Sequence, residues 1–177
     1  MTLFFRRFIG ALVLDASAFE EIEADRHAAM QSVAVVAMVC LASGLAAMAP
    51  GAVSLSTFTT GAIVSLGAWL VWAAVIITLG TVTVPEPQTK SNLPELLRVL
   101  GFASAPGVFI ALAAMRSAAP LVLVVVTIWM IAGAVIGVRQ ALDYRSTPRA
   151  IGVCAVAWLL SLSVVFAVLM MFSAKVS

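Results

Sequence analysis

The residues best suited to chemistry stand close together in "FEEIEADRH", residues 19–27. Glu23 and His27 are four positions apart, so on one helix their side chains would share a face, with Glu20 one turn earlier. Carboxylate and imidazole groups in this arrangement could bind a divalent metal. Because the chain has a single histidine and no second ligand motif, a solvated helix face is the favoured interpretation, and we expect no metal or cofactor.

Motifs of enzymes and of nucleic-acid-binding proteins are absent from the sequence. It contains no G-x-S-x-G motif, no glycine-rich loop ahead of a helix and no aspartate inside its long apolar runs. The net charge of +2 offers no basic excess that would attract nucleic acid. We therefore expect neither enzyme activity nor a nucleic-acid partner.

A second polar group lies at the edges of two apolar runs. Glu95 and Arg98 occur in "PELLR", and Arg139 and Asp143 occur in "VRQALDY". The spacing of Arg139 and Asp143 predicts a pair on one face of a helix. These four residues form the candidate polar or partner site. Two roles are open for them, a docking site for a ligand or partner and a salt-bridged anchor between helices, and the anchor is the simpler role.

The elements that must position these residues follow from the composition. Hydrophobic residues make up 63% of the 177 positions and charged residues 10%, and the mean hydropathy is +1.16, which excludes a water-exposed globular domain. A hydrocarbon layer about 30 Å thick requires roughly 20 apolar residues per helix. An all-α, polytopic membrane protein is therefore predicted, with an N-terminal segment 1–27, five spans at about 28–49, 59–81, 96–115, 120–138 and 150–172, and a short C-terminal tail 173–177.

The N-terminal segment contains two short helical patterns. Apolar residues recur at helical spacing over residues 3–13, which predicts a short amphipathic helix in the membrane interface. Arg6 and Arg7 would then lie at the level of the lipid headgroups. Ser17 and Glu20 fit a capping box and predict the start of a second short helix.

The charged residues predict the orientation of the chain. Eight of the ten arginines and lysines flank the spans on the side of the N-terminus. Because these side chains resist transfer across the membrane, we expect the N-terminus in the cytoplasm and the C-terminus outside. All eight acidic residues lie on the same side, so we expect residues 20–26 and 139–149 to neutralise each other and build a folded polar surface there.

Small and kinking residues inside the spans predict how the helices pack. Ser104, Pro106 and Gly107 lie in the middle of the third span and predict a kink, which either improves packing or lines a polar crevice. Packing is the favoured role. Gly133 and Gly137 in the fourth span allow a second backbone to approach closely, within the monomer in the favoured interpretation or across a dimer in the other. The tryptophans map near the middle of their spans, where we expect them to pack inside the bundle: Trp69, Trp72, Trp129 and Trp158.

Four segments resemble the Yip family, the Ypt-interacting membrane proteins, in its bacterial form: "FEEIEAD" before the first span, "ELLRVLGFASAPG" entering the third, "VRQALDY" leaving the fourth and "RAIGVCAVAWLL" in the fifth. The resemblance rests on the order, spacing and number of spans and covers nearly the whole chain. It implies a five-helix bundle with a cytoplasmic N-terminus. Eukaryotic members are associated with Rab-type GTPases and vesicle traffic. This chain lacks their long polar N-terminal region and their tyrosine- and glycine-bearing motifs, so Rab-type GTPase binding is not carried over.

These patterns together predict a Yip-like, multi-pass protein of the bacterial cytoplasmic (inner) membrane. It would act as a non-enzymatic membrane organiser, trafficking-type protein or scaffold with a cytoplasmic polar docking face. Its expected partners are the lipid bilayer, other membrane proteins or a second copy of the chain in a homo-oligomer. The alternative is a small transporter, channel or lipid-handling protein that uses the kink at Pro106. No ionisable residue lies at mid-depth in a span, which favours the first interpretation.

Overall fold

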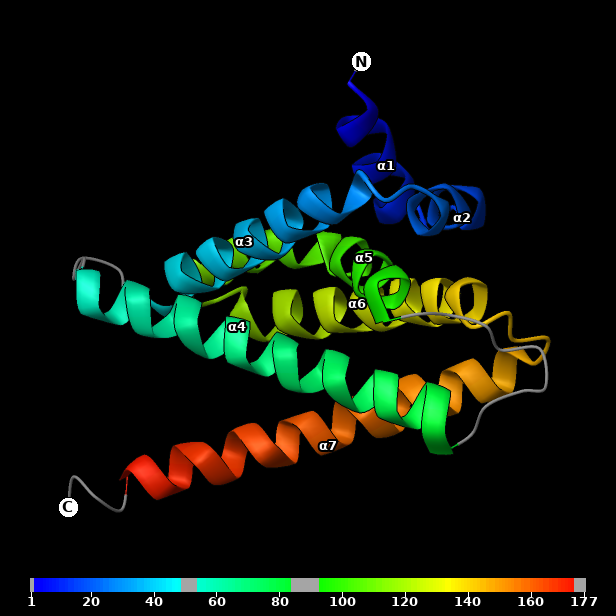
Figure 1. Cartoon of the computed structure of the whole chain (residues 1–177). Helices are drawn as coiled ribbons and strands as arrows, with labels where there is room; N and C mark the ends of the chain where they lie inside the picture. Colours follow the sequence, from blue (N-terminus) through cyan, green and yellow to red (C-terminus); the bar gives the residue numbers. More distant parts are fainter. Residues whose placement is uncertain (1, 49–53, 84–92, 174–177) are drawn as a thin grey trace.

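The computed structural model describes residues 2–48, 54–83 and 93–173, and in these ranges the regular structure is entirely helical (Figure 1). Two short helices precede five longer helical units. Two of these units change helix type along their length. In chain order the elements are α1 (Leu3–Leu12), α2 (Ala16–Ala24), α3 (Ala28–Ala47), α4 (Leu55–Thr78) continued by a π-helix (Leu79–Thr83), α5 (Leu93–Ala103) followed by a 3-10 helix (Ala105–Ala114), α6 (Ala119–Ala141) and α7 (Thr147–Ser173).

Five helical units are long and apolar enough to cross a membrane, which confirms the predicted fold class. Their ends differ from the predicted ones by a few residues. The second unit begins at Leu55 because Ser54 caps it, with the Ser54 hydroxyl accepting a hydrogen bond from the Thr57 backbone N–H. The fourth extends to Ala141 and the fifth begins at Thr147. Residue 49 and tail residues 174–177 lie outside the described residues.

The third unit is the central one. It packs against α3 and α6, and 67% of its most apolar window is buried, against 17% for the α4 unit. In Figure 1 the long helices lie roughly side by side, with α7 at the edge of the bundle. The surface of α4 and α7 is correspondingly apolar and exposed, as expected for helices that face lipid.

The break at Pro106 has a different form from the predicted kink. Helix α5 ends at Ala103, and the chain continues as a 3-10 helix rather than as a bent α-helix. The Ser104 hydroxyl donates to the Gly101 carbonyl oxygen over 2.6 Å, and the Gly107 N–H donates to the Ser104 carbonyl oxygen over 2.8 Å. These bonds bind the carbonyl oxygens of Gly101 and Ser104 at the point where the helix changes type, beside a proline that has no N–H to donate. Ser104, Pro106 and Gly107 are all buried.

The glycines of α6 lie against α5. A side-chain carbon added to Gly133 would meet the Ala103 carbonyl oxygen at 3.2 Å, and one added to Gly137 would meet Val99 Cγ1 at 2.4 Å. Phe19 of α2 also reaches Gly137. Both glycines therefore allow close approach inside the monomer.

Helix α1 runs crosswise to the long helices (Figure 1), and its exposed side carries Leu3, Phe5 and Ile9 together with Arg6. Its C-terminal end is fixed by the Trp129 indole N–H, which donates to the Leu12 carbonyl oxygen over 2.8 Å. Helix α2 then begins at Ala16, because Asp15 rather than Ser17 is its N-cap. The Asp15 carboxylate accepts from the Ser17 N–H over 2.9 Å, so the predicted capping box of Ser17 and Glu20 is wrong, and the cap lies before Ser17.

Candidate functional site

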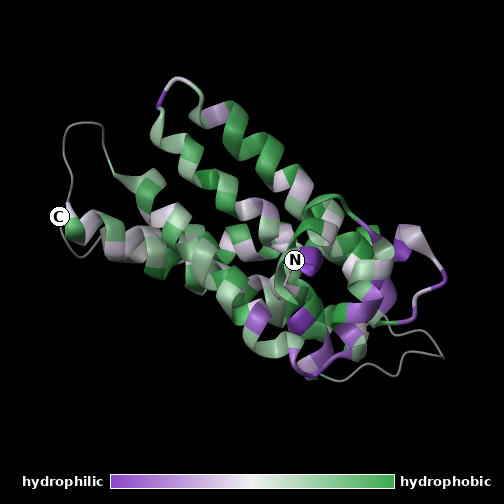
Figure 2. Ribbon diagram, turned by 90° about the horizontal axis from the view of Figure 1, so that it is seen from above, coloured by the Kyte–Doolittle hydropathy of each residue, from purple (hydrophilic) through white to green (hydrophobic). Residues whose placement is uncertain are grey.

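Hydrophilic residues gather around α1, α2 and the neighbouring helix ends, whereas most of the bundle is hydrophobic (Figure 2). We call this region the polar cap. It brings together residues from the N-terminal helices, the beginning of α5 and the end of α6. Its main members are Arg6, Arg7, Glu20, Glu21, Glu23, Asp25, Glu95, Arg98, Arg139, Gln140, Asp143, Tyr144 and Arg145.

Arg7 joins three helices in the polar cap. Its side chain is only 2% exposed, and its guanidinium donates to Glu21 over 3.0 Å, to Asp25 over 2.6 Å and to Gln31 over 3.0 Å. Arg6 donates to Glu21 from the exposed side. The hydrogen bond from Arg6 lowers the pKa of Glu21, and the one from Arg7 lowers the pKa of Asp25. Arg7 is therefore held by carboxylates of the polar cap, and its position at headgroup level stays a prediction.

Arg98 holds the C-terminal end of α2. It is 5% exposed, and its guanidinium donates to the backbone carbonyl oxygens of Ile22 and Glu23. These are among the last carbonyls of α2, where the helix has no further N–H partners and a positive charge is favourable. Arg98 therefore binds backbone of another helix and does not line the hollow described next.

A polar hollow of about 410 Å³ lies between α2 and the end of α6. Glu20 borders it and accepts a hydrogen bond from the Gln140 side chain over 2.6 Å. This contact brings residues 20–26 next to residues 139–149, as the charge pattern predicts. Of the four residues of the candidate polar site, Arg139 and Asp143 line the hollow and Glu95 and Arg98 do not; the full lining is Glu20, Glu23, Arg139, Gln140, Asp143, Tyr144 and Arg145.

Asp143 does not share a helix with Arg139 in the predicted way. Helix α6 ends at Ala141, and Asp143 adopts a left-handed backbone conformation with φ 53°. The Tyr144 N–H then donates to the Arg139 carbonyl oxygen over 2.9 Å, which closes the helix end. Asp143 therefore lies beyond the last turn of α6 rather than on the same helix as Arg139, although both residues line the hollow.

Tyr144 fastens this turn to the end of α4. It is 3% exposed, and its hydroxyl donates to the Gly80 carbonyl oxygen in the π-helix over 2.8 Å. Leu142 packs against Gly80, where an added side-chain carbon would come within 2.5 Å. The Arg149 guanidinium lies 6.0 Å from the centre of the Tyr144 ring. The contacts of Tyr144 and Leu142 with Gly80 therefore fix one wall of the hollow to the end of the α4 unit.

Glu23 has the most altered acidity in the polar cap. Its pKa is raised from 4.5 to about 7, first by partial burial and then by the negative charges of Asp143 and Glu95, against the opposing effect of Arg98. Its carboxyl group therefore changes charge near neutral pH. The net charge of the hollow therefore changes by one unit as Glu23 gains or loses a proton near neutral pH.

The predicted metal candidates Glu20, Glu23 and His27 do not form a set. Helix α2 ends at Ala24 and Asp25 is extended, so Glu23 and His27 do not share a helical face. The Asp25 carboxylate causes this break, since it binds Arg7 and accepts from the His27 N–H over 2.9 Å. Among the described residues, no group of three or more histidine, cysteine, aspartate or glutamate side chains could hold a metal ion.

Sequence reasoning missed three residues that build the polar cap. Arg7 was assigned to the headgroups, and Gln140 and Tyr144 were assigned no role. A signal existed for Tyr144, the only tyrosine of the chain, which stands between Asp143 and Arg145 at the end of an apolar run.

One protein-family model covers most of the polar cap and most of the membrane spans. The family model for the Yip1 domain matches residues 9–169. That range contains α2, all of the hollow and most of the five long helical units. No curated protein and no solved structure matches the sequence.

Proposed function

Because this chain belongs to the Yip1 domain family of multi-pass membrane proteins, we propose that it is a non-enzymatic organiser that binds a protein partner through the polar cap. Members of the family are generally non-enzymatic membrane proteins. The proposal places the N-terminus and the polar cap in the cytoplasm and the C-terminus outside, on the asymmetry of arginine and lysine. It places the protein in a bacterial inner membrane.

The single observation that carries the proposal is the hollow of about 410 Å³ with charged walls. A loop that only connects two membrane spans does not require a pocket of defined shape. Here Arg7 and Arg98 fix α2, and Tyr144 fixes the other wall, so the hollow has a defined form. Preorganised walls reduce the entropy lost on binding.

The chemistry of the walls indicates the kind of partner. Three carboxylates border the hollow, those of Glu20, Glu23 and Asp143, and the pKa of Glu23 is raised to about 7 by burial and by its acidic neighbours. A lysine or arginine side chain entering beside Glu23 would relieve this repulsion and favour its charged form. We therefore propose a cytoplasmic segment with an exposed basic side chain as the partner, either from another membrane protein or from a second copy.

Photo-crosslinking in intact cells tests this function. A crosslinking amino acid at Arg139, which is exposed at the hollow, should give discrete protein adducts, and Glu23→Lys should abolish them by reversing the charge. The matched control places the crosslinker at Ser117, an exposed residue at the opposite end of α6. Equal adducts at both positions, or adducts at Arg139 that persist in Glu23→Lys, would contradict docking at the hollow.

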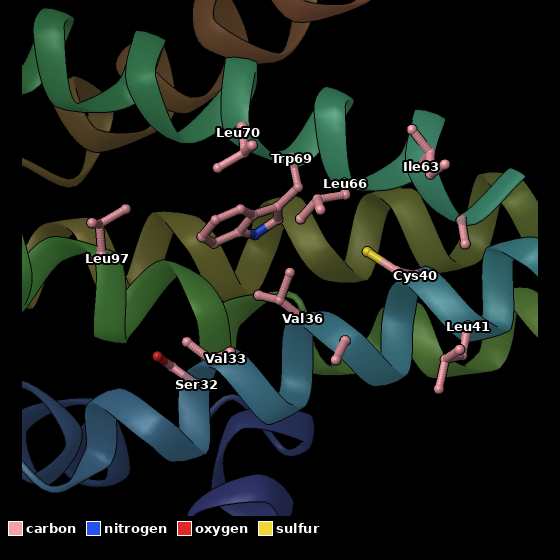
Figure 3. Close-up of a pocket in the computed structure, with 12 residues that line it drawn as sticks. Ser32, Val33, Val36, Cys40, Leu41, Ile63, Leu66, Trp69, Leu70 and Leu97 are labelled. Carbon is pink, nitrogen blue, oxygen red and sulfur yellow. The ribbon is translucent and has the colours of Figure 1, made fainter. Parts of the chain in front are cut away.

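A second candidate function, lipid handling, is favoured by an apolar groove of about 620 Å³ between α3 and α4. Figure 3 shows Trp69 and Leu66 directed from α4 toward α3, with Val36 and Cys40 opposite them. The groove lies in the spans, so a lipid chain is its natural occupant. Robust ion, solute or lipid flux in reconstituted vesicles, lost in Arg98→Ala or Arg139→Ala, would favour this candidate over the organiser.

A further inference from the structure

A second cavity of about 420 Å³ lies deeper in the bundle, among α3, α4, the 3-10 helix, α6 and α7. Its wall is largely apolar but carries three tryptophans and three hydroxyl groups. Trp69 borders both this cavity and the groove of Figure 3. These tryptophans and hydroxyl-bearing residues are Ser65, Trp69, Trp72, Thr127, Trp158 and Ser161.

Two indole N–H groups at this cavity have no acceptor. Trp72 is 7% exposed, and the Nε1 atoms of Trp72 and Trp69 are buried without a hydrogen-bond partner in the part of the chain that the structure describes. Buried tryptophans usually find a partner, because an unpaired buried donor is destabilising. Trp129 follows this rule through its bond to the Leu12 carbonyl oxygen. Two exceptions at one cavity indicate that an acceptor belongs there.

None of the hydroxyl groups of the cavity accepts a hydrogen bond from these two donors. The Ser65 hydroxyl accepts from Ser43 over 3.0 Å, and the Ser161 hydroxyl donates to the Trp158 carbonyl oxygen over 2.9 Å. The Trp69 and Trp72 nitrogens are covered by neighbouring side chains, so a ligand must rotate the indoles toward the cavity to reach them. The required ligand brings its own acceptor oxygen into an apolar space.

The depth of the tryptophans narrows the class of ligand. Trp69 lies at the middle of the α4 unit, Leu55–Val82, and Trp72 is three residues further, about 4.5 Å along the helix. In a hydrocarbon layer about 30 Å thick, both lie roughly 10 to 15 Å from the ester groups of the lipids. A phospholipid carbonyl does not reach that depth. An acceptor at this depth must therefore belong to a molecule that dissolves in the membrane interior.

We propose that this cavity binds a quinone of the membrane, with its ring carbonyl oxygens accepting hydrogen bonds from Trp69 and Trp72. A flat ring can stack on an indole face, and the cavity volume lies within the usual range of about 300–1,000 Å³ for small-molecule sites. Leu123 and Leu162 line the cavity and are 46% and 47% exposed, so the site opens between α6 and α7 toward lipid. An isoprenoid tail can leave by that opening. The proposal is for binding and includes no electron transfer.

Indole NMR of the full chain in lipid nanodiscs tests the proposal directly. Titration with a short-tailed ubiquinone should shift two of the four indole N–H signals downfield in a saturable manner, as new hydrogen bonds form. Trp69→Phe and Trp72→Phe should remove the two shifting signals, one each. Trp129→Phe is the matched control, because its N–H is already bonded outside the cavity, and it should leave both shifts unchanged.

Affinity measurements by quinone-dependent thermal stabilisation provide the second readout. Trp69→Phe and Trp72→Phe should each weaken quinone binding by about 10-fold, the effect of roughly one hydrogen bond. An alkylnaphthalene has the ring without the carbonyl oxygens, so it should bind the unmodified protein at least about 10-fold more weakly than the quinone does. Added phospholipid should not compete. Equal binding of the naphthalene and the quinone, or the absence of any indole shift on saturation, would overturn the proposal even if a variant fails to fold.

Discussion

Replacing Glu23 by glutamine should stabilise the protein at neutral and alkaline pH. Glutamine keeps the shape of the side chain and removes a charge that burial and the carboxylates of Asp143 and Glu95 make unfavourable. The polar hollow itself remains, because Arg98 binds the backbone carbonyl oxygen of Glu23 and not its carboxylate. The substitution therefore isolates the electrostatic effect of one carboxylate.

The magnitude follows from the pKa of Glu23, which is raised from 4.5 to about 7. At about 1.4 kcal/mol per pH unit, this rise sets an upper limit of about 3 kcal/mol. Because the carboxyl group is only partly buried, solvent screening reduces the expected gain in the free energy of unfolding to about 1 kcal/mol. For a chain of this length such a gain raises the melting temperature by about 2–4 °C.

The pH dependence has a definite sign. The folded state binds the Glu23 proton more tightly than the unfolded state, so protein stability due to this group is present below pH 4.5 and is lost as the pH rises through about 7. The advantage of Glu23→Gln over the unmodified chain should thus be full at pH 8 and absent below pH 4.5. Heat unfolding in dodecyl maltoside, followed by circular dichroism at both pH values, measures the difference.

Glu21→Gln is the matched control on the same helix. Its hydrogen bond with Arg6 lowers the pKa of Glu21, so this carboxylate stabilises the fold above about pH 4.5 and its stabilising effect is lost as the pH falls. Glu21→Gln should therefore destabilise the protein at pH 8, opposite to Glu23→Gln. Equal melting temperatures for Glu23→Gln and the unmodified chain at pH 8 would refute the reasoning about the polar cap.

Four further predictions concern the framework. Arg7→Met should lower the free energy of unfolding by about 2 kcal/mol by leaving carboxylates unpaired, whereas Arg6→Ala at the exposed pair should cost less than about 1 kcal/mol, both measured by heat unfolding. Gly137→Leu should cost about 1–3 kcal/mol by overpacking against α5, while Gly67→Ala, which meets nothing within 4 Å, should be neutral or slightly stabilising in the same assay. Arg98→Met should loosen the end of α2 and speed amide hydrogen exchange there. A reporter enzyme that folds only outside the cytoplasm should be active when it is fused to the C-terminus.

Each of these outcomes has a clear opposite. Equal losses for Arg7→Met and Arg6→Ala would show that burial of Arg7 does not matter to stability. A tolerated Gly137→Leu would contradict the close approach of α5 and α6. Unchanged exchange in Arg98→Met would remove its role at α2, and a cytoplasmic reporter would reverse the proposed orientation.

The five spans could be predicted because each one is a long apolar run, and a membrane imposes that length on any crossing helix. A break in the third span that packs against other protein was also predictable, since a proline inside a helix frees backbone groups that only neighbouring protein can satisfy. The form of the break was not. Whether residues after Pro106 bend as an α-helix or wind as a 3-10 helix depends on packing, here of Gly107 against Val39, which no local pattern encodes.

The polar cap was predictable as a region and not as a set of pairs. Charge counting placed residues 20–26 and 139–149 on one side, but the choice of partners depends on where helices stop. Asp25 ends α2 by binding Arg7, and a left-handed residue at Asp143 ends the turn after α6. Both positions lie where regular helical spacing no longer applies.

The crosswise position of α1 has a mechanical consequence. Its exposed face is largely apolar, with Phe5 54% and Ile9 44% exposed, while the Trp129 bond and Arg7 hold its other face to the bundle. In the predicted interfacial position, such a helix would displace acyl chains from one leaflet, and it has no counterpart among the described residues at the opposite end. The two leaflets would then differ in area around each molecule, so crowding of many copies would favour a membrane that curves away from the side of the N-terminus.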